Sequence, residues 1–125
     1  MSAKQTKRKS FDHYLAIYTE GLKAIIKQET DDENTNVQIK VNEALNRMVM
    51  FYPEQTKSLL VELMNSSDIR IAIIAAVNFA RTFDMDAEMK NKARIIKKAF
   101  CNSKYCTPIM QVGLAGFPDI HNKYR

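Results

Sequence analysis

The sequence is poor in residues that make turns and in residues that cross-link secreted proteins. Its 125 residues include three Gly, three Pro and two Cys. So few Gly and Pro argue against an all-β fold, which needs many tight turns. Two cysteines cannot build the disulfide framework of a small secreted domain. No apolar run approaches the roughly 20 residues that span a bilayer, and none follows the N-terminus as in a signal peptide. We therefore expect a cytoplasmic chain without a membrane partner.

The positive charge is concentrated at one end of the chain. The net charge is +5, and residues 1–9 contribute +4 of it through four cations and no acid. The remaining residues are close to neutral, and 46% of all residues are hydrophobic, as in a globular domain. We expect a disordered basic leader over residues 1–9, a single helical domain over 10–118 and a C-terminal tail over 119–125.

From Ser10 onward the apolar residues recur at intervals of three and four, which predicts successive helices. The first expected helix follows Ser10, the second begins near Val37 and the third begins at Pro53. The fourth spans 67–83, the fifth begins near Asp86 and the sixth begins at Pro108. Ser10 and Thr107 are suitable N-cap residues, and Pro suits the first helical turn. Ser66, Ser67 and Asp68 offer cap side chains for the helix over 67–83, and Asp84 and Asp86 for the next one. An acidic stretch without apolar residues, 28–36, is expected to connect the first two helices. Gly21, in the middle of the first helix, marks a close helix crossing.

No segment alternates apolar and polar residues as a half-buried strand does. The sequence therefore predicts an all-α fold of about six antiparallel helices, arranged as three helical hairpins.

The segment 66–80, SSDIRIAIIAAVNFA, is apolar around almost its whole helical circumference, so its helix is expected at the centre of the domain. Its polar side chains after the turn are Arg70 and Asn78, followed by Arg81 on the same narrow stripe. This segment resembles the second helix of a HEAT repeat, with a turn Asp (Asp68), an Arg two residues later (Arg70) and small residues on helical spacing. The resemblance implies that the hairpins stack into a short HEAT-like array, an α-α superhelix.

The two ends of the domain, FDHYLAIYTEGLKAI (11–25) and VGLAGF (112–117), also resemble a family of short bacterial all-α proteins of unknown function. HEAT-like arrays present rigid surfaces to other proteins. Resemblance to HEAT-like immunity proteins implies that the partner is a toxin that this chain neutralises.

The residues that carry catalysis or bind metals do not occur in recognisable spacing. Cys101, Cys106 and His121 are better explained as loop and tail residues than as metal ligands, and Asp84 and Asp86 as caps of the helix that follows them. No nucleophile–base pair and no phosphate-binding loop is present. We therefore expect a chain that is not an enzyme and holds neither cofactor nor metal.

Four cations share one side of the helix that follows Asp86. We predict that the partner is another protein, and that it is acidic. The predicted protein-binding surface consists of Arg70, Asn78, Arg81, Lys90, Arg94, Lys97 and Lys98. The alternative is nucleic-acid binding through the basic leader and the same helix, although no aromatic residues for base stacking lie between the cations.

Overall fold

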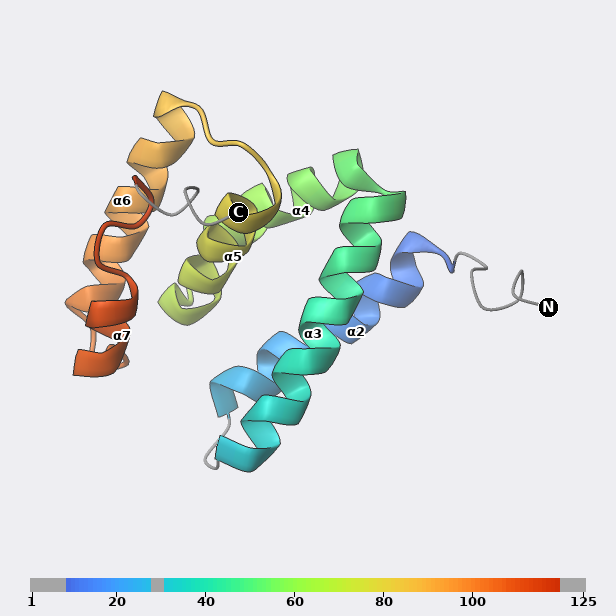
Figure 1. Ribbon diagram of the computed structural model, residues 1–125, viewed down its shortest axis with the longest axis horizontal. Coiled ribbons are helices and arrows are strands. Elements are labelled where there is room, and N and C mark those ends of the chain that lie inside the picture. The colour runs from blue at the N-terminus through green and yellow to red at the C-terminus, as the bar shows by residue number, and fades with distance from the viewer. Residues whose placement is uncertain (1–8, 28–30, 120–125) are drawn as a thin grey trace. The chain divides into compact units, whose positions relative to one another are not determined.

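The computed structural model describes residues 9–27 and 31–119, with residues 31–35 described by their backbone alone. Within this part of the chain the fold is all-α, with six helices and no strand, as the apolar spacing predicts (Figure 1). The helices are α2 (Phe11–Lys27), α3 (Asp31–Phe51), α4 (Pro53–Met64), α5 (Ile69–Thr82), α6 (Ala87–Cys101) and α7 (Pro108–Gly113). The chain forms two compact units, Met1–Thr56 and Lys57–Arg125, whose boundary falls within α4 and which we describe separately.

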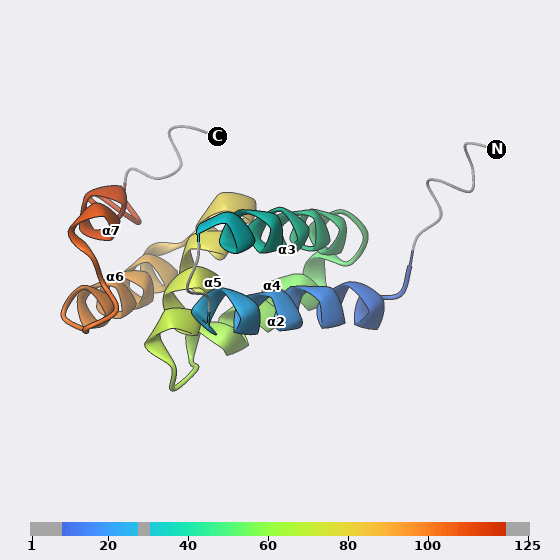
Figure 2. The same ribbon diagram turned by 90° about the horizontal axis from the view of Figure 1, so that it is seen from below.

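The first unit is built on the packing of α2 against α3, which run in opposite directions (Figures 1 and 2). Ser10 begins α2 as predicted, because its side-chain oxygen accepts a hydrogen bond from the backbone N–H of His13 at 3.1 Å. The buried residues of the pair are Tyr14, Tyr18, Leu22, Val41, Ala44, Leu45 and Met48.

At Gly21 there is no room for a side chain between α2 and α3. A Cβ atom at this position would overlap Cγ2 of Val41, which is itself buried. The close helix crossing predicted from Gly21 is therefore confirmed.

The connection predicted over residues 28–36 is shorter than expected, because α3 already begins at Asp31. The start expected near Val37 is therefore wrong, since α3 begins before its first apolar residue. Acidic residues are favourable in the first turn of a helix, where they face the positive end of the helix dipole, and the sequence has three at this place.

Hydrogen bonds connect the residues that follow α3 with those at the start of α2 in the first unit. The hydroxyl of Tyr52 donates to the carbonyl of Lys9 at 2.7 Å, and the Lys9 N–H donates to the Tyr14 hydroxyl oxygen at 3.1 Å. Thr56 is fully buried, and its hydroxyl donates to the Tyr52 carbonyl at 2.7 Å, which satisfies this buried polar group. Lys9, assigned to the leader, is thus attached to the helices, and residues 1–8 lie outside the described residues.

The second unit contains α5, which packs against α6. Asp68 is the N-cap of α5, where its carboxylate accepts from the Arg70 N–H at 3.0 Å. Half of the residues of α5 are buried, and Arg81 is its single exposed residue. The prediction that this helix is packed on several sides is confirmed.

Two polar contacts connect α4, and the residue that follows it, to other parts of the second unit. The ammonium of Lys92 on α6 donates a hydrogen bond to the side-chain oxygen of Asn65. The ammonium of Lys57 lies 5.8 Å from the centre of the Phe83 ring, which follows α5.

Candidate protein-binding surface

The predicted basic surface is carried by α6. Asp86 begins this helix, since its carboxylate accepts from the Met89 N–H at 2.8 Å. The buried face consists of Ala93, Ile96 and Phe100. The predicted cations lie beside this face, with Arg94 and Lys98 exposed and Lys90 and Lys97 half-buried.

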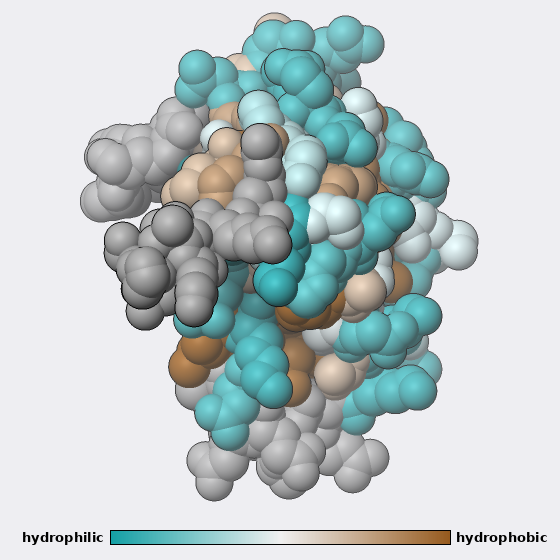
Figure 3. All heavy atoms as spheres, turned by 90° about the vertical axis from the view of Figure 1, so that its right-hand side faces the viewer, coloured by the Kyte–Doolittle hydropathy of each residue, from teal (hydrophilic) through white to brown (hydrophobic). Residues whose placement is uncertain are grey.

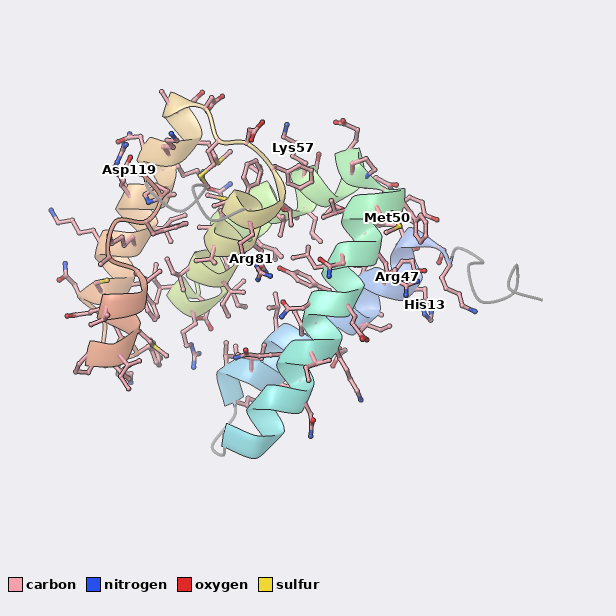
Figure 4. The ribbon with its side chains drawn as sticks, viewed as in Figure 1. His13, Arg47, Met50, Lys57, Arg81 and Asp119 are labelled. Atoms are coloured by element: carbon pink, nitrogen blue, oxygen red, sulfur yellow. The ribbon has the colours of Figure 1, made fainter. Side chains whose placement is uncertain are left out.

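The C-terminal segment of the described chain is bound to this basic side. The Arg94 guanidinium donates to both carboxylate oxygens of Asp119, at 2.6 and 3.3 Å, and Figure 4 shows Asp119 beside α6. Lys97 donates to the carbonyl of Phe117 at 3.1 Å. Phe117 and Pro118 are buried. Two of the four predicted cations therefore hold the chain's own residues, and Asp119, assigned to the tail, is part of this arrangement.

The charge around Asp119 changes its acidity. The hydrogen bond from Arg94, with the positive charges of Arg94, Lys90 and Lys97, lowers the pKa of Asp119 below its ordinary value, against a smaller opposing effect of desolvation. Because the folded pKa is the lower one, the stabilisation by this carboxylate is present above the unfolded pKa. It is lost as the pH falls through the folded pKa.

We expect Arg94→Gln to raise the pKa of Asp119 towards its ordinary value, because the main hydrogen-bond donor and the nearest cation are both removed. The carboxyl carbon chemical shift of Asp119, followed by NMR against pH, measures this change. Lys92→Gln on the same helix is the matched control and should leave the pKa of Asp119 unchanged, since Lys92 bonds to Asn65 instead. An equal pKa in all three proteins would contradict the assigned ion pair.

The predicted residues on α5 have different surroundings from those expected. The Arg70 guanidinium forms a two-point ion pair with Asp68, at 3.0 and 2.9 Å, and lies 4.2 Å from the centre of the Tyr105 ring. The hydrogen bonds that the Asp68 carboxylate accepts from the Arg70 side chain and from the backbone lower the pKa of Asp68. Asn78 is only 5% exposed, so its side chain does not lie on an accessible surface. Arg81 is exposed (Figure 4).

An exposed apolar surface on α7 was not predicted. None of the residues of this helix is buried, and Ile109, Val112 and Met110 are 83%, 77% and 45% exposed. We call these three residues the α7 surface. The sequence signal was the composition of the helix, PIMQVG, in which Gln111 is the single polar side chain. A helix of six residues cannot bury apolar groups on every side.

Both ends of helix α7 are attached to the rest of the chain by specific contacts, which fix the position of the α7 surface. Thr107 is the N-cap, accepting from the Met110 N–H at 3.2 Å, and Pro108 occupies the first turn, as predicted. After the helix, Gly116 adopts a positive φ of 82°, which glycine tolerates best. The buried Phe117 and the ion pair of Asp119 then attach the segment to α6. The chain thus anchors a helix whose apolar residues face solvent.

The part of the sequence that contains α6 and α7 carries a net positive charge. Residues 87–119 contain six cations and two acids, a net charge of +4. Exposed apolar residues elsewhere are more separate: Ile39 and Met50 on α3 are 52% and 66% exposed but eleven positions apart. On the face shown in Figure 3, hydrophilic side chains separate the hydrophobic ones.

Cys101 and Cys106 are both reduced and half-buried. Within the described residues, no group of three His, Cys, Asp or Glu side chains could hold a metal ion. His121, the third member of the constellation considered above, lies outside them.

Comparison with known proteins gives no assignment. No protein family model matches the sequence, and no curated protein and no solved structure shows detectable similarity to it. None of the helices in the described part of the chain is long and apolar enough to cross a membrane.

Proposed function

We propose that this chain is a non-enzymatic, cytoplasmic helical domain that binds an acidic protein through the α7 surface. The observation that carries the proposal is the exposure of Ile109, Met110 and Val112 on a helix that is anchored at both ends. Contiguous exposed apolar side chains, unlike scattered single ones, mark interaction sites. Burying each such side chain contributes about 1.5–3 kcal/mol.

The net charge of +4 over residues 87–119 supports an acidic partner. Opposite charges around an apolar contact speed association and exclude partners of the same sign. Among the predicted residues, the exposed Lys98 lies on α6, the helix to which the segment after α7 is attached, and is suited to such a contact at the rim. Arg94 could meet a carboxylate of the partner only in competition with Asp119, to which it is bonded.

Nucleic-acid binding is less well supported by these surroundings. Lys97 and Arg94 already have partners within the chain, and the most exposed side chains of α7 are aliphatic, which neither stack on bases nor pair with phosphates. Binding to nucleic acid would weaken steeply as salt is added, whereas apolar binding would not.

We also propose that the helices form a HEAT-like array. The support comes from the turn before α5, where Asp68 caps the helix and pairs with Arg70. These contacts give a local reason for the Asp-x-Arg spacing. An experimental structure in which successive hairpins stack in the same sense would support this proposal, and any other arrangement of the hairpins would contradict it.

The protein-binding proposal is tested by comparing immobilised full-length variants. The test variant is Ile109→Asp with Val112→Asp, and the matched control is Ile39→Asp with Met50→Asp, which also replaces two exposed apolar residues on a helix. We expect the wild type and the control to retain the same acidic protein from a cell extract, and the test variant to lose it. Retention that is equal for all three proteins contradicts the proposal.

Two other results would also contradict it. The α7 surface could instead bind a second copy of this chain, in which case sedimentation would show a wild-type dimer that the test variant does not form. Retention of nucleic acid in place of a protein, lost as salt rises and after deletion of residues 1–9, would favour the alternative function.

The narrower proposal is that the partner is a toxin. A captured protein that arrests growth when expressed alone, and does not when expressed together with this chain, would support it. A harmless partner would contradict the toxin assignment and leave the protein-binding function in place.

A further inference from the structure

The guanidinium of Arg94 on α6 holds a carboxylate in the free chain. Its Nε and Nη2 groups donate to the two carboxylate oxygens of Asp119, at 3.3 and 2.6 Å. This two-point arrangement is the one in which arginine recognises the carboxylates of other molecules. The contact therefore shows what kind of group fits this position on α6.

Two lysines lie on the same side of α6 as Arg94. Lys90 precedes Arg94 by four residues and Lys97 follows it by three, spacings that place side chains next to one another on a helix. Lys97 donates to the Phe117 carbonyl at 3.1 Å, which keeps its ammonium close to the segment that carries Asp119. The positive charges of both lysines contribute to lowering the pKa of Asp119. We call Lys90, Arg94 and Lys97 the Arg94 site.

The ion pair in this site is open to solvent. The side chains of Arg94 and Asp119 are 48% and 53% exposed. Ion pairs as exposed as this one contribute little net stability, because water solvates both groups when they separate. A carboxylate of another molecule can therefore reach Arg94 and replace Asp119 at a small cost in free energy.

Only the side chain of Asp119 has to move in this exchange. Phe117 and Pro118 are buried, and the hydrogen bond from Lys97 to the Phe117 carbonyl does not involve Asp119. The segment after α7 thus remains attached to α6 while the Asp119 carboxylate turns towards solvent. The α7 surface keeps its position, so the exchange does not interfere with binding there.

We propose that the Arg94 site binds a carboxylate of the acidic partner, and that Asp119 is an internal competitor, which occupies the site in the free chain. This inference rests on the proposed function for its partner and adds the site at which an acidic side chain of that partner binds. A tethered competitor weakens the apparent affinity in proportion to the fraction of the chain in which the site is occupied by its own carboxylate. For an exposed ion pair the apparent affinity is lowered about two- to sixfold.

The test measures binding of a fluorescein-labelled decaglutamate peptide to the full-length chain by fluorescence anisotropy, at about 0.1 M salt. At this ionic strength charges more than about 10 Å apart are largely screened, so the affinity reports contacts close to the peptide. We expect Asp119→Asn to bind the peptide about two- to sixfold more tightly than wild type, because the competing carboxylate is removed. Arg94→Gln should bind it more weakly than wild type, and adding Asp119→Asn to Arg94→Gln should give no gain.

Glu62→Gln is the matched control. Glu62 is exposed on α4, and its replacement changes the net charge by the same single unit as Asp119→Asn. The residue after α4, Asn65, is bonded to Lys92, which is not part of the Arg94 site. The control should therefore keep the wild-type affinity for decaglutamate. Circular dichroism of each variant checks that the helices are retained.

This experiment is separate from the test of the proposed function. Decaglutamate has no apolar side chains, so Ile109→Ala with Val112→Ala should bind it as wild type does. If Asp119→Asn gives no gain while an acidic protein is still retained through the α7 surface, the Arg94 site is wrong and the protein-binding function stands. If no protein is retained through the α7 surface, the proposed function fails whatever the affinity for decaglutamate.

Three results with decaglutamate would overturn the inference: equal affinity of wild type and Asp119→Asn, an equal gain for Glu62→Gln, or a gain from Asp119→Asn that persists with Arg94→Gln. A labelled oligothymidylate gives the fourth. If it binds more tightly than decaglutamate and shows the same gain with Asp119→Asn, the site selects phosphates, and the assignment to carboxylates is wrong.

Discussion

Phe79→Ala is expected to lower the free energy of unfolding by about 3–5 kcal/mol, the usual cost of removing a buried aromatic ring. Phe79 is 2% exposed, and its ring centre lies 5.4 Å from that of Phe83. The alanines of α5 are buried as well, so neighbouring atoms are already close to the helix and cannot move in to fill the cavity. Urea denaturation followed by helical circular dichroism measures the loss. At a typical slope of about 1–3 kcal/mol per molar urea, the midpoint should fall by about 1 M or more.

The matched control for this change is Arg81→Ala, at the single exposed position of the same helix. We expect a change within about 0.5 kcal/mol, since the side chain is exposed and alanine suits a helix. If Phe79→Ala cost less than about 1 kcal/mol, α5 would not be a core helix and the fold description would be wrong.

Gly21→Ala is expected to destabilise the first unit by about 2 kcal/mol, within the range for overpacked cores. At an open helical position the same substitution stabilises, since alanine loses less backbone entropy than glycine. Here the added methyl group would overlap Cγ2 of Val41, and a valine in a helix has essentially one available rotamer. Either α2 and α3 move apart or Val41 leaves its rotamer, and the denaturation midpoint falls in both cases.

Two further variants separate this steric cause from others. Gly113→Ala is the matched control, because a Cβ at Gly113 has no atom within 4 Å, and it should be neutral or slightly stabilising. Adding Val41→Ala to Gly21→Ala should make the pair cost less than the sum of the single changes, because the overlapping methyl is gone. Strict additivity would show that the methyl overlap is not the cause.

Much of the fold could be predicted because its signals are local in the sequence. The helix starts at Pro53, Asp86 and Thr107 depend on one or two residues and their neighbours in the chain. The burial of α5 follows from its own composition. Gly21 indicated a close crossing because a glycine in the middle of a helix is unfavourable without a steric reason.

The surface was predicted less well, because it depends on contacts between residues that are distant in the sequence. Arg94 and Asp119 are 25 positions apart, and no spacing rule connects them. Asn78 is polar but buried, which a single helical stripe cannot reveal. The exposure of α7 depends on where the segment after it attaches, through Phe117 and Lys97. The charge pattern alone therefore located the cations on α6 but did not show the contacts that Arg94 and Lys97 make within the chain.

Binding of an acidic protein by the α7 surface is measured by the dissociation constant of the complex reconstituted from purified proteins. Isothermal titration of the partner into wild type, Ile109→Asp with Val112→Asp, and Ile39→Asp with Met50→Asp gives the three values. We predict affinity at least about tenfold weaker for the α7 variant, a loss of about 1.4 kcal/mol or more, and an unchanged value for the α3 variant. Equal affinities for all three, or a loss confined to the α3 variant, would show that the α7 surface is not the binding site.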